Sequence, residues 1–368
     1  MPKPPSPGTL RRLVQPLLRT LETAGHPLRY LFLEITQRCN LQCRHCGSDC
    51  GRETRRDELS TAEWLGFLDD LARRFDRRKV ALVVTGGEPL CRPELDPILE
   101  RLRDHGFAWG MVTNGWALSP RNVERLVRAN IASVTVSLDG LRESHDWLRG
   151  TTGSWDHALA GIRLLARAGI PFFDVVTCAN PRNLAELPQV GETLRAAGVH
   201  DWRLFSIFPK GRARDDPELL LPPAGFRELL AFIRRERDAH HATGFHTRFS
   251  CEAYLPATLD RQVRDEPYFC RAGINIASVL CDGAIGACPN ITRSLVQGNV
   301  RTDDFHHVWE EKFEPYRERS WMRQGPCETC AEWRRCLGNS LHLWDDEARH
   351  TAYCSWELAC GRQPDRKT

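Results

Sequence analysis

The sequence predicts an α/β fold, namely a partial (β/α)6 barrel of the TIM type followed by a small cysteine-rich α+β domain. Six short β-rich runs alternate with helical patterns between residues 31 and 210, which is typical of parallel strands joined by crossover helices. After residue 250 the helical periodicity fades and cysteines gather, which indicates a second domain. We therefore expect an N-terminal extension (1–28), a barrel domain (29–250) and a C-terminal domain (251–368).

Each β-rich run has the length and residue types of a strand. The expected strands are residues 31–36, 80–85, 109–113, 133–138, 172–178 and 202–208. A helix is expected after Ser60, because apolar residues recur on one face from Trp64 to Phe75, and Ser60 and Glu63 have capping-box spacing. Further helices are expected near residues 93–105, 119–129, 155–168, 183–197 and 226–241. Eight units would close a barrel, whereas six leave it open, with the active site still at the carboxyl ends of the strands.

The composition excludes several classes of function. The 51 Lys and Arg residues and 48 Asp and Glu residues give a net charge of +3 and are spread along the chain, so no nucleic-acid-binding surface is indicated. No apolar run has the length of a signal peptide core or a membrane span, so we expect a cytoplasmic protein without a membrane-bound part. Fifteen cysteines are many for that compartment, where disulfides are rare and clustered cysteines more often bind metal.

Three of the cysteines lie on one short loop after the first expected strand. Cys39, Cys43 and Cys46 have the spacing C-x3-C-x2-C. Three thiolates can bind three irons of a 4Fe-4S cluster and leave the fourth iron open for a chelating ligand, whereas a zinc site ordinarily needs four ligands. At these residues the sequence resembles the radical S-adenosylmethionine (SAM) superfamily. In that family the open iron binds SAM, and an electron from the cluster cleaves SAM to a 5'-deoxyadenosyl radical.

The resemblance continues at the ends of later expected strands. The glycines of Gly86-Gly87-Glu88 allow close backbone approach, and its carboxylate can accept hydrogen bonds from an ammonium group. The resemblance implies that this segment binds the methionyl amino group of SAM, that Ser137 binds the ribose and that Arg149 binds the carboxylate. The residues implied to bind SAM are His45, Gly86, Gly87, Glu88, Asn114, Ser137, Asp139 and Arg149.

The C-terminal cysteines form a second pattern. Cys270, Gly283 and Cys288 are followed by C-x2-C-x5-C and a last cysteine. This order resembles the SPASM extension of radical SAM enzymes that modify peptides and proteins, which binds one or two auxiliary 4Fe-4S clusters. The resemblance implies that one cluster is bound by Cys327, Cys330, Cys336 and Cys354, and that Cys270, Cys281 and Cys288 share in a second.

The SPASM pattern is broken at Ser340, where the resemblance calls for a cysteine. We expect the second auxiliary cluster to be incomplete, with three cysteines and an open iron. It could instead take an unusual ligand such as His342 or Cys360, or be absent. A zinc-ribbon staple is the alternative for the whole region, because Cys-x2-Cys pairs also suit zinc. The upstream cysteine loop favours iron-sulfur clusters.

The resemblance implies a radical SAM oxidoreductase that crosslinks, oxidises or epimerises a ribosomally synthesised peptide or protein. A flavodoxin or ferredoxin-type protein would supply the electron. About 30 residues precede the first expected strand, too few for a winged-helix peptide-recognition domain, so a separate recognition protein is expected.

Two other functions stay open. The first is an epimerase or dehydrogenase that acts on a small molecule such as an aminosugar. In an epimerase, a cavity thiol would donate a hydrogen atom to the substrate radical, and Cys178 and Cys251 are the candidates. The second is a non-catalytic iron-sulfur electron-transfer protein, which would have no need for the Gly-Gly-Glu segment, Ser137 or Arg149.

Overall fold

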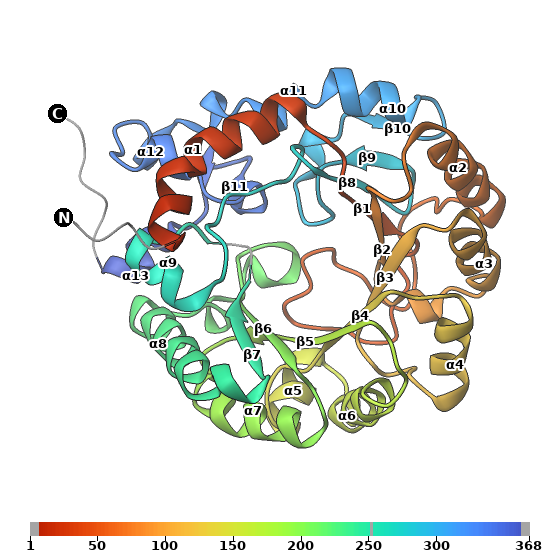
Figure 1. Cartoon of the computed structure of the whole chain (residues 1–368), viewed down its shortest axis with the longest axis horizontal. Coiled ribbons are helices and arrows are strands. Elements are labelled where there is room, and N and C mark those ends of the chain that lie inside the picture. The colour runs from red at the N-terminus through yellow and green to blue at the C-terminus, as the bar shows by residue number, and fades with distance from the viewer. Residues whose placement is uncertain (1–6, 251–252, 362–368) are drawn as a thin grey trace.

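The computed structural model describes residues 7–250 and 253–361, and it contains one large sheet surrounded by helices (Figure 1). Seven parallel strands follow one another in the sheet. They are β1 (Tyr30–Glu34), β2 (Ala81–Thr85), β3 (Ala108–Thr113), β4 (Ser133–Ser137), β5 (Phe172–Ala179), β6 (Asp201–Ser206) and β7 (His246–Phe249). Each pairs with the next in chain order, which confirms the predicted α/β fold with crossover connections.

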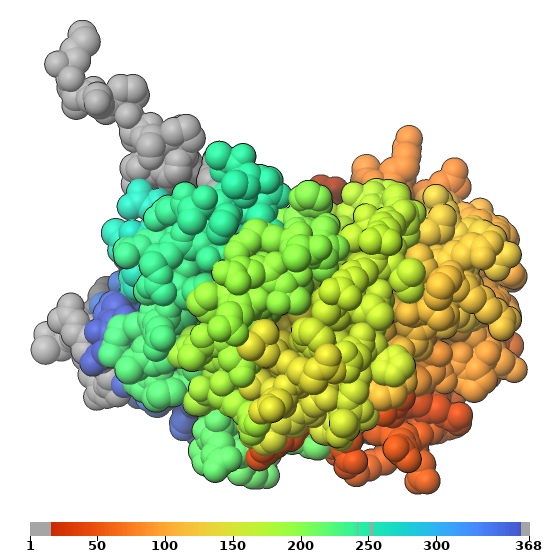
Figure 2. Space-filling model, turned by 90° about the horizontal axis from the view of Figure 1, so that it is seen from below, coloured from red at the N-terminus to blue at the C-terminus, as the bar shows by residue number. Residues whose placement is uncertain are grey.

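Crossover helices cover the outside of this sheet. They are α2 (Thr61–Arg74), α3 (Asp96–His105), α4 (Pro120–Arg128), α5 (Arg142–Arg149), α6 (Ser154–Leu165), α7 (Leu187–Ala196) and α8 (Pro223–His240). The predicted capping box at α2 is present, because Ser60 and Glu63 bond to each other's backbone amides. Leu31 and Leu33 of β1 are fully buried in register with Leu82 and Val84 of β2. Figure 2 shows the yellow-to-green part of the chain as a continuous surface on one side.

Two elements of the barrel were absent from the sequence prediction. The first is β7, which makes seven parallel strands before residue 250 where six were expected. Its four residues alternate between exposed or partly exposed polar side chains and the buried Thr247 and Phe249, which is too short a pattern to detect. The second is α5, whose sequence is almost entirely polar and which is followed closely by α6.

The C-terminal domain adds strands to the same sheet. β8 (Ile276–Val279) pairs in parallel with β1, and β9 (Ala284–Gly286) and β10 (Gly298–Asn299) continue the sheet in antiparallel orientation. Within residues 7–250 and 253–361, β10 and β7 are the two edges of this sheet, so the barrel is open as predicted. The domain boundary near residue 250 stays a prediction.

The predicted hairpin at Asp282-Gly283 joins β8 to β9. The Gly283 amide donates to the Leu280 carbonyl at 2.9 Å, and of the two turn residues only Gly283 has a left-handed backbone (φ +83°). A Cβ atom at Gly283 would lie 2.6 Å from Asn299 Oδ1 of β10, so the turn needs glycine for space as well as for backbone conformation.

Short helices and one small hairpin complete the C-terminal domain. They are α9 (Ala257–Val263), α10 (Phe305–His307), α11 (Glu314–Arg317), α12 (Trp333–Cys336), α13 (Ser355–Cys360), β11 (Trp344–Asp345) and β12 (His350–Thr351). The N-terminal extension contains α1 (Pro7–Gly25), whose internal Pro16 argues against a helix in the sequence. Arg19 of α1 donates to the carbonyls of Arg334 and Arg335 at 2.9 and 3.0 Å, and Figure 1 shows α1 beside α11 and α12.

Among the helices described, none has the length and apolarity to cross a membrane.

Candidate active site

The loop after β1 presents Cys39, Cys43 and Cys46 to one cavity of about 310 Å³. Cys39 and Cys43 are buried and Cys46 is partly buried. The loop is held at both ends, since the Cys39 amide donates to the Gly51 carbonyl at 2.7 Å and the Arg44 amide to the Leu148 carbonyl at 2.8 Å. The three thiols therefore share one pocket, as their spacing predicted.

The carboxyl ends of the strands form the wall of this cavity. Gly86 and Gly87 follow β2, Asn114 follows β3, and Ser137 ends β4. Cys178 of β5 and the residues from Phe205 to Phe208 at the end of β6 close the other side. The predicted location of the active site, at this end of the barrel, matches the geometry.

The thiols of Cys39, Cys43 and Cys46 each accept a hydrogen bond. Leu41 N lies 3.5 Å from Cys39 Sγ, Cys50 N lies 3.4 Å from Cys46 Sγ, and Arg149 Nη1 lies 3.6 Å from Cys43 Sγ. Such donors stabilise thiolates and cluster sulfurs, so the residues present fit a 4Fe-4S cluster. In the described part of the chain, no three His, Cys, Asp or Glu side chains converge on a single metal ion. A cluster does not need that convergence, because each thiolate binds a different iron.

Glu88 lies beneath the cavity and does not line it. Its buried carboxylate accepts hydrogen bonds from Thr113 Oγ1 at 2.9 Å, from Asn114 N at 2.8 Å and from Leu90 N at 3.1 Å. Burial raises the pKa of Glu88, and these donors partly offset the rise. The predicted role of Glu88 in binding the ammonium group of SAM stays a prediction. Glu88 braces the β2 and β3 ends, while Gly86 and Gly87 face the cavity.

Arg149, the last residue of α5, lies in the cavity beside Asp139. Asp139 Oδ2 accepts from Arg149 Nε at 2.6 Å, and its Oδ1 accepts from Cys178 N at 2.7 Å. Although burial opposes ionisation, the guanidinium lowers the pKa of Asp139 below its usual value. The structure thus brings Asp139, Arg149 and Cys43 into one network, whereas Asp139 itself does not line the cavity.

His45 lies in the same loop with its Nδ1 buried and without a hydrogen-bond partner among the described residues. Burial lowers the pKa of His45 to about 4, so the ring is neutral at pH 7. A neutral, unpaired ring that lines the cavity fits the predicted contact with an adenine base. Its role in binding SAM stays a prediction.

The sequence prediction missed the segment after β6 that holds the cysteine loop. The Arg212 side chain donates to the Cys43 carbonyl at 2.7 Å and the Cys50 carbonyl at 2.9 Å, and its amide donates to the Cys46 carbonyl at 3.1 Å. A Cβ atom at Gly211 would clash with the Cys46 carbonyl oxygen. A glycine and an arginine after a strand are a weak signal, and only the fold reveals these contacts.

The structure brings Cys327, Cys330, Cys336 and Cys354 together. Burial and then the neighbouring thiols of Cys354, Cys327 and Cys330 raise the pKa of Cys336, which places all four in one group. This grouping is the one predicted for a fully ligated auxiliary cluster. The raised pKa values of Cys327, Cys336 and Cys354 keep these thiols protonated in the cluster-free chain, so binding iron must displace their protons.

Cys270 and Cys288 lie near each other. Burial and then the Cys270 thiol raise the pKa of Cys288, which is about 11. Cys281 lies in the β8–β9 turn, where its thiol contacts Glu34 of β1. The place of Cys281 in the ligand set stays a prediction.

Ser340 is buried, and its hydroxyl bonds to the Tyr268 hydroxyl. Of the alternative ligands, His342 has a buried Nε2 with no partner among the described residues, and its ring lies 4.3 Å from that of Phe208. Cys360 ends α13, which packs against α8. The nature of a second auxiliary cluster stays a prediction.

The two candidate hydrogen donors have different outcomes. Cys178 lines the cavity, whereas Cys251 lies outside the described residues. The described part of the chain contains 14 cysteines, and none is in a disulfide.

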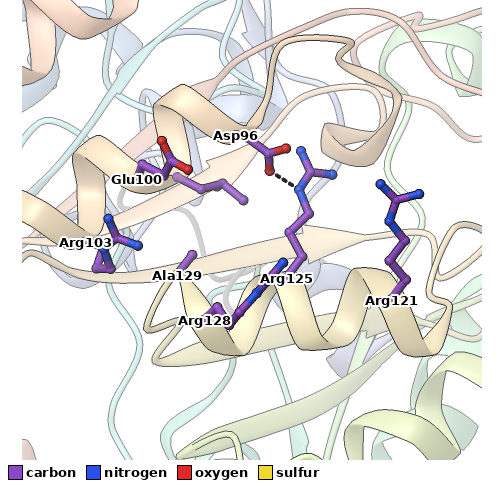
Figure 3. A pocket seen from close by; sticks show the side chains of 8 residues that line it. Asp96, Glu100, Arg103, Arg121, Arg125, Arg128 and Ala129 are labelled. Atoms are coloured by element: carbon purple, nitrogen blue, oxygen red, sulfur yellow. Dashed lines mark hydrogen bonds and ion pairs between the residues drawn. The ribbon is translucent and has the colours of Figure 1, made fainter.

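A second hollow of about 290 Å³ lies outside the barrel between α3 and α4 (Figure 3). Arg121, Arg125 and Arg128 of α4 line it, and Arg125 pairs with Asp96 of α3. It shares no residue with the cavity at the strand ends, so it is not part of the candidate active site.

Two family models match the chain where the sequence predicted. The radical SAM superfamily model matches residues 33–194, and a model described as an iron-sulfur cluster-binding domain, SPASM, matches residues 270–336. The chain is also 30% identical to a mycofactocin maturase, MftC, of Mycobacterium tuberculosis over 316 residues, which are 84% of this chain and 77% of that protein. The chain belongs to the radical SAM superfamily. It is a radical SAM/SPASM enzyme, so the zinc staple and the non-catalytic electron-transfer protein are set aside.

Other relatives match over most of their length. An AdoMet-dependent heme synthase of Methanosarcina barkeri is 28% identical over 357 residues, which are 92% of this chain and 98% of that protein. Among solved structures, SuiB of Streptococcus suis bound to precursor peptide SuiA has a TM-score of 0.70, 15% identity, and coverage of 93% of this chain and 79% of SuiB. The peptide-bound anSMEcpe has a TM-score of 0.69, 16% identity, and coverage of 91% and 94%. These structures share the radical SAM fold, and the cofactors predicted for the chain, 4Fe-4S clusters and SAM, agree with the family.

Proposed function

We propose that this radical SAM enzyme abstracts a hydrogen atom from a peptide and thereby modifies it by oxidation, crosslinking or epimerisation. Cys39, Cys43 and Cys46 would hold the cluster that binds SAM. When bound, cluster and SAM together supply the 5'-deoxyadenosyl radical that breaks an unactivated C–H bond. The thiols of Cys327, Cys330, Cys336 and Cys354 would hold an auxiliary cluster, which supplies an electron acceptor near the substrate.

The residues of the chain position SAM and exclude water. Gly86 and Gly87 line the cavity and would lie beside SAM, and Arg149 offers its guanidinium to a carboxylate. Ser137 offers a hydroxyl to the ribose, and the neutral His45 ring offers an uncharged face to the adenine. Ile207 and Phe208 place apolar surface on the opposite wall, where the substrate would enter.

We call the candidate active-site cavity the first cavity. The observation that carries the peptide proposal is a second cavity next to it, which is separate from the hollow between α3 and α4. This cavity, of about 160 Å³, is lined by Lys210 and Arg214 on one side and by Thr292 and Asp346 on the other. The first cavity is lined by Phe208 and Asn290, which lie two residues earlier than Lys210 and Thr292 in the same two segments. In this proposal an extended chain spans both cavities, and its polar side chains bind the charged residues of the second. The peptides in SuiB and anSMEcpe agree with this at the level of the fold.

A second candidate is an iron tetrapyrrole substrate. It is favoured by the heme synthases, which match the chain over almost their whole length, and by an Fe-coproporphyrin III synthase of Methanosarcina barkeri that is 27% identical over 293 residues. The aminosugar predicted as a small-molecule substrate has no comparable support.

Deoxyadenosine formation distinguishes the two substrates. We expect that extended peptides raise the rate of deoxyadenosine formation by the reconstituted enzyme above the uncoupled rate, and that Lys210→Ala raises the KM for the peptide while the uncoupled rate stays the same. Stimulation by an iron porphyrin but by no peptide would support the second candidate.

We further propose that the enzyme works in the cytoplasm with a flavodoxin or ferredoxin as electron donor, and that a separate protein presents the peptide.

A further inference from the structure

The three thiols of the cysteine loop receive hydrogen bonds of different kinds. Cys39 accepts from the neutral donors Leu41 N at 3.5 Å and Asn114 Nδ2 at 3.8 Å. Cys46 accepts from the backbone amide of Cys50 at 3.4 Å. Cys43 accepts from a cation, Arg149 Nη1, at 3.6 Å. Among the hydrogen bonds of the described residues, a guanidinium therefore donates to one of the three thiols, Cys43, whereas the Arg212 guanidinium acts on Cys46 through its charge without a hydrogen bond to the sulfur.

The position of this charge is fixed by the fold. Asp139 Oδ2 lies 2.6 Å from both Nε and Nη2 of Arg149, and the carboxylate is in turn held by Cys178 N at 2.7 Å. The end of α5 packs closely against the cysteine loop. A Cβ atom at Gly150, the residue after α5, would clash with the Gln42 carbonyl oxygen. Arg149 and Asp139 are both buried, so solvent screens their charges little.

We propose that Arg149 sets the reduction potential of the SAM-cleaving cluster through its charged hydrogen bond to Cys43, and that Asp139 limits this effect. Reduction adds a negative charge to the cluster, and a nearby guanidinium stabilises that charge. Asp139 carries the opposite charge and weakens the stabilisation. The proposal rests on the assignment of Cys39, Cys43 and Cys46 as cluster ligands in the proposed function.

The test is a redox titration of the reconstituted enzyme without SAM, followed by electron paramagnetic resonance, with the iron content of each variant measured separately. We expect Arg149→Gln to lower the ratio of reduced to oxidised cluster at least about tenfold at a fixed potential, a shift of about 59 mV for one electron. Arg149→Lys keeps the charge and should lower the ratio less. Asp139→Asn should raise the ratio. Val176→Ala changes the lining of the same cavity without changing a charge and should leave the ratio unchanged.

Opposite shifts in the Arg149 and Asp139 variants support the proposal, because a merely structural role has no reason to change sign with charge. Equal potentials, or shifts in one direction for both, would overturn it. If Arg149→Gln fails to take up iron, the comparison of Arg149→Lys with Asp139→Asn decides in the same way. Failure of the wild-type loop cysteines to bind iron would instead refute the proposed function.

Discussion

Three contacts fix the position of Cys43 and of the residue after it. The Cys43 carbonyl accepts from Arg212, its sulfur accepts from Arg149, and the next residue, Arg44, is tied to α5 through Leu148. Burial raises the pKa of Cys39 to about 12 and also raises the pKa of Cys43. Free thiols at these positions are protonated at pH 7, so ionisation must accompany iron binding.

Replacing Cys43 tests the role of this thiol. We expect Cys43→Ala to abolish deoxyadenosine formation and to lower the iron content, because the cluster loses one of three anchors. Cys91→Ala is the matched control, since Cys91 is a partly buried free cysteine near the loop but does not line the cavity. Retained turnover in the Cys43 variant, or equal losses in both variants, would contradict the ligand assignment.

The carboxyl group of Glu34 predicts a pH dependence of stability. It is buried beside Cys281, and burial raises its pKa to about 7. The folded chain then holds a proton that the unfolded chain releases above about pH 4.5, so stability falls as the pH rises from 4.5 to 7 and stays lowered above it. Glu34→Gln removes this penalty, and its gain in stability over wild type should grow with pH to at most about 3 kcal/mol.

Melting temperatures between pH 5 and 8 measure this difference. Glu124→Gln removes a carboxylate at an exposed position of α4 and serves as the control. A stability difference between Glu34→Gln and wild type that does not change with pH would show that Glu34 is ionised throughout the range.

One short helix and one segment after a strand hold the cysteine loop in place. α5 and the segment after β6 approach it from two sides, and both need a glycine at the contact, Gly150 and Gly211. The sequence predicted the strands that carry Gly86, Asn114 and Ser137, because buried parallel strands give strong patterns. It did not predict α5, since a short polar helix has no apolar periodicity.

Gly211 allows a prediction about this packing. Gly211→Ala should lower the melting temperature and the iron retained by the loop, because its Cβ atom would clash with the Cys46 carbonyl oxygen. Gly169→Ala is the matched control, since Gly169 also has a positive φ (+70° against +57°) but no atom near its Cβ position. We expect the control to lose about 1 kcal/mol of stability from backbone strain alone and to keep its iron. Similar losses in both variants would mean that the contact of Gly211 with the loop contributes nothing.

The barrel and the C-terminal domain share one sheet, which the sequence could not predict. Pairing between β8 and β1 joins segments more than 240 residues apart in the sequence, and neither strand carries a signal for its partner. The family resemblance implied the group around Cys336, and the structure places the thiols of Cys327, Cys330 and Cys354 near enough to raise the pKa of Cys336. The ligand role of Cys281, whose thiol contacts Glu34, stays a prediction.

Loss of an auxiliary ligand should separate SAM cleavage from product formation. We expect Cys330→Ala to keep uncoupled deoxyadenosine formation, to lower the iron content by up to about four per chain and to lower the product yield. Cys91→Ala removes a partly buried cysteine outside both groups and should change neither iron content nor yield. Unchanged iron in the Cys330 variant would refute the auxiliary assignment.

The most direct test is to count iron and sulfide per chain after anaerobic reconstitution, for the wild type and for a variant in which Cys39, Cys43 and Cys46 are all alanine. The account predicts that the variant binds about four fewer irons per chain and forms no deoxyadenosine, while it keeps the iron bound by the C-terminal cysteines. Equal iron content and equal SAM cleavage in the two proteins would contradict it.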